Sequence, residues 1–197
     1  MKNISEVKSY ISQSSGIITS KEFKTNNIEK YYINKLISEG IIERYKKGIY
    51  IRTDVFEDEF YILQKKNPSI IFSYNTAMYL LNKTERTPIN IDITVYSGFN
   101  GHRLPKNIKI HYVKKEDLKL GCIKVKTPFG FEVVTYNNER IICDLIKNKN
   151  HGTDKEQANK FIREMFLEKQ IDILKLIEYS KLLNCEKKVR TIMEVFI

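Results

Sequence analysis

The apolar residues of the first 51 positions recur at two different spacings, and the change between them separates helices from strands. Residues 4–14 have the spacing of an amphipathic helix. Thr19 followed by Glu22 three residues later forms a capping box, which predicts that a second helix begins there. A third apolar stripe over residues 28–37 predicts another helix, which Gly40 ends because glycine adopts the left-handed cap conformation without steric cost.

After Gly40 the period falls to about two, and the runs 41–45 and 48–51 flank a charged turn. Helices followed by such a hairpin predict a winged helix-turn-helix DNA-binding domain over residues 1–53. The turn between its second and third helices contains Asn26 and Asn27, and either side chain could cap the third helix. The alternative is a small three-helix domain whose charged face is merely solvated.

The rest of the chain predicts an amphipathic connecting helix over 54–67 and a separate domain over 68–197. In 89–96 apolar and polar residues alternate strictly, which predicts a strand with one buried face. Helices are expected over 73–81, 137–147, 154–169, 173–183 and 186–196. Further strands are expected over 70–72, 108–112, 122–126 and 129–134. The predicted strand 108–112 would expose a basic face. The predicted fold class is α+β, a winged helix-turn-helix followed by an α+β domain with a small sheet and several helices.

The net charge of +10 is concentrated in two stretches of the chain. Residues 1–53 contribute +5, and residues 103–126 contribute +6. Such concentration is typical of proteins that bind a polyanion. For the second stretch, the alternative explanation is that its lysines only reflect an AT-rich genome, which would also account for the many Asn and Ile residues.

The third helix and the hairpin turn supply the candidate DNA contacts. Lys30, Tyr31, Asn34 and Lys35 would enter the major groove, where side chains read base edges and bind phosphates. The turn would touch the adjacent backbone or minor groove. The full set is Asn27, Lys30, Tyr31, Asn34, Lys35, Arg44, Tyr45, Lys46 and Lys47. A second basic surface is predicted from Arg103, Lys106, Lys109, Lys114, Lys115, Lys124 and Lys126.

Motifs for catalysis, cofactors and metals are absent from the sequence, so we predict no enzyme, no cofactor and no metal site. His102, His111 and His151 lack metal-ligand spacing. Glu139 and Arg140 with Asp144 could form an acid–base set, but an ion pair between residues four apart on a helix or an interdomain contact explains them as well. Because the three cysteines are widely spaced, we expect them to be buried apolar residues and not part of a disulfide framework. With no apolar segment long enough to cross a bilayer and no signal peptide, we expect a cytoplasmic protein.

Three short motifs, in their order and spacing, resemble the AbiEi family of antitoxins. The wing ends in Lys47-Gly48-Ile49-Tyr50, similar to the family's Arg-Gly-Val-Tyr. The family's Ser-x-x-(Ser/Thr)-Ala-x-x-Leu helix is matched by Ser73, Thr76, Ala77 and Leu80, and its Arg-x-x-x-Asp-Leu helix by Arg140, Asp144 and Leu145. The family's Leu-His-Gly-Leu is replaced by Tyr79-Leu80-Leu81-Asn82.

This resemblance implies a transcriptional regulator and antitoxin of a type IV toxin–antitoxin, or phage abortive-infection, system. Such a protein would bind double-stranded DNA at inverted repeats in its own promoter. It would counteract a nucleotidyltransferase toxin without a stable complex, and the second domain would carry the antitoxin activity. The alternatives are a winged-helix regulator with a ligand-sensing domain, and a nucleic-acid-processing enzyme.

Overall fold

A computed structural model describes residues 3–148 and 152–196 of the chain, so His151 lies outside the described residues. The chain folds into two compact units. The first comprises residues 1–68 together with 127–131, and the second comprises 69–126 with 132–197. The first unit therefore takes five residues from a distant part of the sequence.

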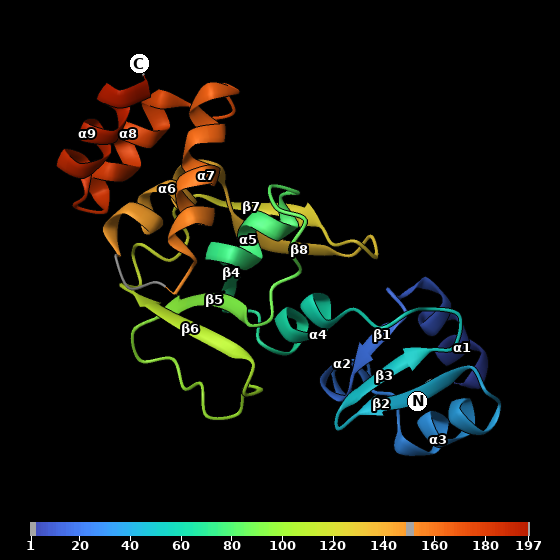
Figure 1. Ribbon diagram of the computed structural model, residues 1–197. Coiled ribbons are helices and arrows are strands. Elements are labelled where there is room, and N and C mark those ends of the chain that lie inside the picture. The colour runs from blue at the N-terminus through green and yellow to red at the C-terminus, as the bar shows by residue number, and fades with distance from the viewer. Residues whose placement is uncertain (1–2, 149–151, 197) are drawn as a thin grey trace. The chain divides into compact units, whose positions relative to one another are not determined.

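The first unit is built from four helices and a three-stranded sheet among its described residues (Figure 1). Its sheet has the antiparallel order β1-β3-β2. The sequence pattern did not reveal β1, because three consecutive buried residues show no alternation. The elements are α1 (Ile4–Gln13), β1 (Ile17–Thr19), α2 (Ser20–Thr25), α3 (Lys30–Ser38), β2 (Ile42–Lys46), β3 (Ile49–Arg52) and α4 (Glu59–Lys66).

Capping boxes define where the first two helices begin. The predicted box is present in α2, where the Thr19 hydroxyl accepts from the Glu22 amide and the Glu22 carboxylate accepts from the Thr19 amide at 2.8 Å. A similar box with Asn3 and Glu6 starts α1. The apolar faces of α1, α2 and α3 then meet in a core whose fully buried members include Val7, Phe23 and Leu36. This is the arrangement of a winged helix-turn-helix, as predicted.

Helix α4 is fastened within the first unit by two polar side chains. Asp58 is completely buried, and its carboxylate accepts from the Tyr61 amide and from the Thr127 hydroxyl. The ring of Tyr61 stacks on Phe131 at a centroid distance of 4.6 Å. Lys65 donates to the Ile17 carbonyl at 2.6 Å and thereby attaches α4 to β1. The connecting helix predicted over 54–67 is shorter than expected, because Asp58 caps it and the helix begins at Glu59.

The second unit combines a five-stranded mixed sheet with five helices among its described residues. The strand order is β6-β5-β4-β8-β7, in which β5–β6 and β4–β8 are parallel and the other pairs antiparallel. The elements are β4 (Ile71–Phe72), α5 (Tyr74–Leu80), β5 (Ile91–Tyr96), β6 (Ile108–Val113), β7 (Cys122–Lys126), β8 (Glu132–Tyr136), α6 (Asn138–Lys147), α7 (Lys155–Leu167), α8 (Ile173–Leu182) and α9 (Glu186–Phe196). The predicted α+β class is confirmed.

Both faces of β5 are buried, which corrects the expectation of one buried face. Asp92 and Thr94, on the face predicted to be polar and exposed, are each 1% exposed. Helix α5 packs against this strand, and the Thr76 hydroxyl accepts from the Asp92 amide at 2.8 Å. The strand β6 also departs from its expected exposed basic face, because the His111 ring lies 2.7 Å from the Asp92 carboxylate and is mostly covered.

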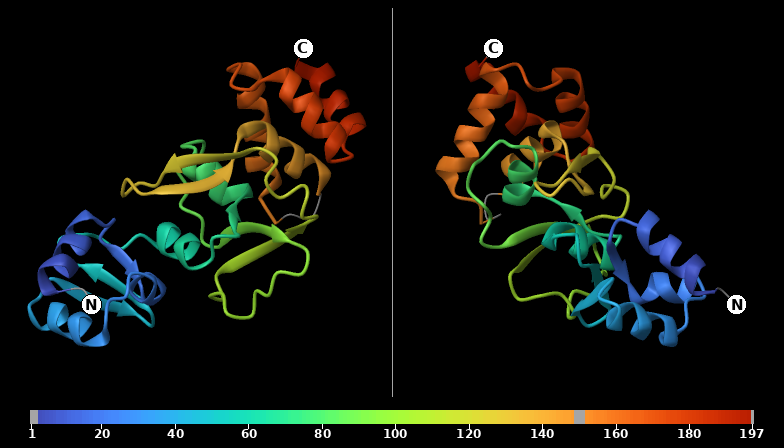
Figure 2. Two further views of the ribbon diagram at one scale, coloured as in Figure 1. Left: turned by 180° about the vertical axis from the view of Figure 1, so that it is seen from behind. Right: turned by 90° about the vertical axis from the view of Figure 1, so that its right-hand side faces the viewer.

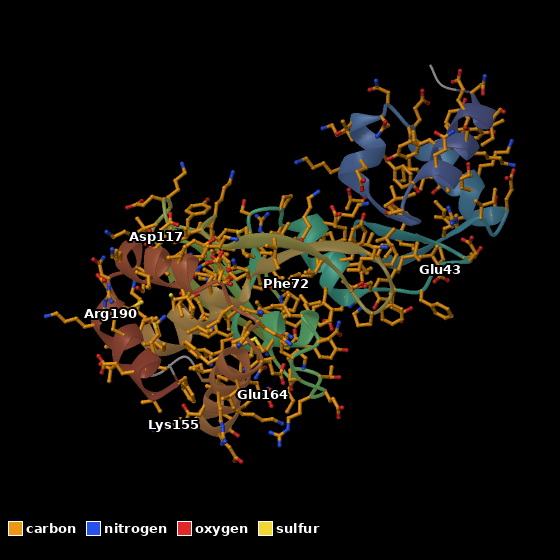
Figure 3. All side chains as sticks on the ribbon, turned by 90° about the horizontal axis from the view of Figure 1, so that it is seen from above. Glu43, Phe72, Asp117, Lys155, Glu164 and Arg190 are labelled. Atoms are coloured by element: carbon orange, nitrogen blue, oxygen red, sulfur yellow. The ribbon has the colours of Figure 1, made fainter. Side chains whose placement is uncertain are left out.

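The C-terminal helices α6 to α9 gather together where the chain ends, as both views in Figure 2 show. Their shared core includes Ile142, Phe161 and Leu176. In Figure 3, Phe72 lies among the side chains of the second unit, whereas Lys155 and Arg190 project outward from α7 and α9. Across residues 3–148 and 152–196, no helix has the length and apolar character needed to cross a membrane.

Candidate nucleic-acid interface

Helix α3 is oriented by its apolar face, which leaves a polar face on the surface of the first unit. Leu36 is fully buried in the core, and Ile33 packs against the same cluster. On the other face Lys30, Tyr31 and Asn34 are exposed. Lys35, at the border, is half-buried. The helical period thus separates the residues that hold α3 from those that can contact a ligand.

The start of α3 differs from the sequence prediction. Neither Asn26 nor Asn27 caps it; Glu29 occupies the cap position and makes no side-chain cap hydrogen bond. Asn26 instead donates to the Glu22 carbonyl at 2.9 Å, while Asn27 takes the left-handed conformation with φ 53° that closes the turn. Because the first amides of α3 receive no side-chain cap, they can donate to a phosphate group.

The wing is the hairpin β2–β3. Several of the predicted DNA-contacting cations lie at or beside its turn. Gly48, with φ 78°, permits the tight turn. Arg44, Lys46 and Lys47 are exposed. Tyr45 is half-buried against the small core formed by Ile17, Ile49, Ile51 and Ile62, and the Lys46 ammonium lies 4.8 Å from the centre of its ring.

The start of α2 lies beside the wing turn, which the sequence did not reveal. The Ser20 amide donates to the Gly48 carbonyl at 2.9 Å. The neighbouring Lys21 is exposed and therefore joins the candidate contacts. The signal is a hydrogen bond across 28 positions of sequence, so no local pattern could have revealed it.

The positive charges of this face are not neutralised by the protein. In the described part of the chain, no ion pair involves a cation of α3 or of the wing turn. The cations concerned are Lys30, Lys35, Arg44, Lys46 and Lys47. Unpaired cations on one face attract phosphates, and counterion release makes such binding dependent on salt.

The second basic stretch does not lie in one strip along the sheet. Lys109 belongs to β6 and Lys124 and Lys126 to β7, and these strands form opposite edges of the five-stranded sheet. Four strand spacings of ~4.8 Å separate the edges by roughly 19 Å. Lys124 pairs with Glu132 at 2.7 Å, and Lys114 lies 4.0 Å from Glu116. The remaining members, Arg103, Lys106, Lys115 and Lys126, are exposed.

The suggested acid–base group on α6 is a buried ion pair. Arg140 is fully buried; its Nε atom donates to both carboxylate oxygens of Asp144 at 3.1 and 3.0 Å. Its Nη1 donates to the carbonyls of Asp117 and Leu120. Burial raises the pKa of Asp144, and the guanidinium opposes that rise. Glu139 accepts from the Asp172 amide. These contacts join α6 to its neighbours and leave the group inaccessible to a substrate.

A groove of about 910 Å³ lies in the second unit between the 82–86 segment and α7. Its lining includes Phe161 and Met165, and five acidic side chains outnumber three basic ones there. Within the part of the chain that the structure describes, no three metal-binding side chains cluster.

Comparison with protein families identifies residues 5–53 as a match to a family described as transcriptional regulator, AbiEi antitoxin. The match spans α1 to β3, which are the helices and wing described above. The resemblance inferred from sequence motifs is confirmed over these residues. A search of curated proteins found no match.

Proposed function

We propose that this protein is a sequence-specific DNA-binding antitoxin that represses its own toxin–antitoxin promoter and counteracts a nucleotidyltransferase toxin in phage abortive infection. The observation that supports it most directly is the exposed polar face of α3 next to a wing with unpaired cations, in a segment matching antitoxin transcriptional regulators. The protein would act in the cytoplasm, where its DNA lies.

In this proposal α3 enters the major groove. The groove is about 12 Å wide and admits a helix. Asn34 can pair with an adenine edge through its amide, and Lys30 can bind a guanine edge or a phosphate. The wing would then lie along the adjacent backbone, with Lys46 and Lys47 next to phosphates and Tyr45 holding the position of Lys46.

The test is a binding titration of the full chain with DNA from its own upstream region, against a scrambled duplex, at several salt concentrations. We expect the upstream fragment to bind ~10³-fold more tightly, with a steep salt dependence. Footprinting should then reveal inverted repeats. Equal and weak binding to both duplexes would refute promoter recognition.

A lysine on the wing and a lysine far from it in the sequence provide a matched comparison. Lys46→Ala should weaken binding to all duplexes and lower the salt slope by about one unit, because one phosphate contact is lost. Lys187→Ala removes an exposed lysine from α9 and should leave the slope unchanged. Equal slopes for both variants would remove Lys46 from the interface.

The antitoxin part of the proposal needs a separate measurement. The chain would be co-expressed with the toxin encoded beside it, and growth rescue measured. The two edges of the second sheet can be tested independently, by Arg103→Glu with Lys106→Glu near β6 and by Lys126→Glu on β7. Loss of rescue with intact promoter binding would assign the altered edge to antitoxin activity. Loss of promoter binding would instead assign it to DNA.

The enzyme alternative predicts a different result. Purified protein incubated with nucleic acid, nucleotides and Mg²⁺ or Mn²⁺ should show neither cleavage nor nucleotide transfer. Either activity, retained through further purification, would contradict a purely regulatory role.

A further inference from the structure

The ammonium group of Lys65, on α4, lies among four oxygen acceptors of the first unit. It donates to the Ile17 carbonyl at 2.6 Å and forms an ion pair with the Glu22 carboxylate at 3.1 Å. The hydroxyls of Ser15 and Tyr61 lie at 3.2 and 3.3 Å. These acceptors are enough to use every hydrogen of an ammonium group. Because the side chain is only 14% exposed, Lys65 acts inside the unit and not as a free surface charge.

Glu22 connects Lys65 to the two helices of the helix-turn-helix. One of its carboxylate oxygens pairs with Lys65, while the other accepts from the Thr19 amide and hydroxyl in the capping box that begins α2. The Glu22 carbonyl accepts from the amide and from the side chain of Asn26, in the turn before α3. Lys65 therefore holds the first turn of α2 and, through the same residue, the turn that leads into α3.

The first turn of α2 also contacts the wing. The Ser20 amide donates to the Gly48 carbonyl of the wing turn at 2.9 Å. A shift of α2 would break this bond and separate the exposed Lys21 from the wing. Lys65 is bonded in addition to Ile17 of β1, the strand that pairs with β3 of the wing. None of its four acceptors belongs to the predicted DNA contacts, so its influence on DNA binding would be indirect.

Helix α4 is fixed in its turn by the segment 127–131, which joins β7 to β8 and belongs to the first unit. The Thr127 hydroxyl donates to the buried Asp58 carboxylate at the start of α4. The Phe131 ring stacks on the ring of Tyr61, which lies one helical turn before the lysine. The strands β7 and β8 themselves belong to the second unit, so the chain connects α4 to that unit through this segment.

We propose that Lys65 is a positioning residue for DNA binding, and that the segment 127–131 controls it by fixing α4. This inference rests on the proposed function and adds its regulation. With the segment in place, Lys65 holds α2, the turn before α3 and the wing in the one arrangement that fits DNA. When the segment separates from α4, only a fraction of the molecules keeps that arrangement, and the affinity for DNA falls in proportion. DNA and the docked segment therefore favour the same conformation of the first unit.

Hydrogen exchange of the full chain without DNA tests the local part of the proposal. Lys65→Met removes the ammonium but keeps an unbranched side chain, and Lys66→Met removes the same charge from the next, exposed position of α4. Lys65→Met should speed exchange of the Ser20 amide by at least ~10-fold, because its bond to Gly48 opens more often. Lys66→Met should leave it unchanged. Equal Ser20 exchange in Lys65→Met and in the unaltered chain would overturn the proposal.

Binding to the upstream duplex then separates positioning from stability, at a temperature where circular dichroism shows every variant to be folded. Lys65→Met should bind ~10-fold more weakly, as expected if about one molecule in ten keeps the competent arrangement. Phe131→Ala, which removes the ring that stacks on Tyr61, should also weaken binding. Added to Lys65→Met it should have little further effect, since it acts through the lysine, and additive losses would refute this route. Lys66→Met should bind like the unaltered chain.

Linkage provides a readout that a merely structural role would not change. DNA should slow exchange of the Gly130 and Phe131 amides, which donate to Thr127 within the segment, and this protection should be lost in Lys65→Met. Absence of protection in the unaltered chain would refute control by the segment. Failure of the unaltered chain to prefer the upstream duplex would refute the proposed function and this inference with it. An intact preference with unchanged affinity in folded Lys65→Met would refute the inference alone.

Discussion

Replacing Arg140 by methionine tests whether the Arg-x-x-x-Asp motif holds the second unit together. Its guanidinium makes contacts with the Asp144 carboxylate and with two carbonyls, and its carbon atom lies 4.4 Å from the centre of the Tyr136 ring. The substitution leaves the Asp144 carboxylate buried without its counter-charge and leaves two turn carbonyls without their donor. Breaking a buried pair in this way costs about 3–5 kcal/mol.

Arg190 on α9 provides a matched control. It also pairs with a carboxylate four residues away, Glu186, at 2.8 Å, but its side chain is 53% exposed. An exposed pair of this kind contributes about 0.3–0.5 kcal/mol. Arg190→Met should therefore hardly change stability, although it removes the same type of side chain from the same type of pair.

The assay is urea unfolding of the full chain, followed by hydrogen exchange of the α6 amides, which reports on the second unit. A double variant with Asp144→Leu removes both charges and should cost less than Arg140→Met alone, because no buried charge remains. The stability cost of Arg140→Lys should lie between the costs of the double variant and of Arg140→Met, since an ammonium cannot reach the carboxylate and both carbonyls together. A cost below about 1 kcal/mol for Arg140→Met would refute the structural interpretation of this motif.

Three further predictions concern other parts of the molecule. Asn34→Ala should relax base preference at one position of the site by about 1–3 kcal/mol in competition binding, whereas a uniform loss for all sequences would show that Asn34 reads no base. Asp58→Ala should destabilise the first unit by about 1–3 kcal/mol and speed amide exchange in α4, because the buried Thr127 hydroxyl and the Tyr61 amide lose their acceptor; unchanged exchange would contradict it. The pKa of Cys122 rises from 9.0 to about 11 on folding, so the unfolded chain loses this proton first and stability should decline as pH rises from 9 to 11. After allowance for its partial exposure, the decline is about 1 kcal/mol, and a Cys122→Ala variant that loses as much stability over that range would refute the assignment.

The elements that the sequence predicted well are those with local signals. The capping box at Thr19, the glycine at 40 and the change of period after it lie within a few residues of the structure they determine. The strand β1 has no such signal, since Ile17 and Ile18 pair with residues more than 30 positions away. Alternation in β5 showed which residues share a face, but the burial of Asp92 depends on α5 and His111. Such coverage is decided by tertiary packing.

The candidate interface was predictable to a similar extent. Helical period placed Lys30, Tyr31 and Asn34 on one face, and the structure exposes all three. Their contact with DNA stays a prediction. Local sequence could not predict the uncapped start of α3 or the position of Lys21 beside the wing. The Asn26 side chain bonds to the Glu22 carbonyl of the preceding helix, and the Ser20 amide bonds to the distant Gly48 carbonyl. The second basic stretch is contiguous in sequence, yet strand order distributes it over two edges of a sheet.

The return of residues 127–131 to the first unit has a practical consequence for dissecting this protein. A fragment ending at Pro68 would contain all of the segment that matches the antitoxin regulators, but it would lack the Thr127 hydroxyl and the Phe131 ring. Its Asp58 carboxylate would lose a buried donor, and Tyr61 would face water instead of an aromatic ring. Weak DNA binding by that fragment would then reflect an incomplete unit rather than a missing recognition surface, so point variants of the full chain are the sounder comparison.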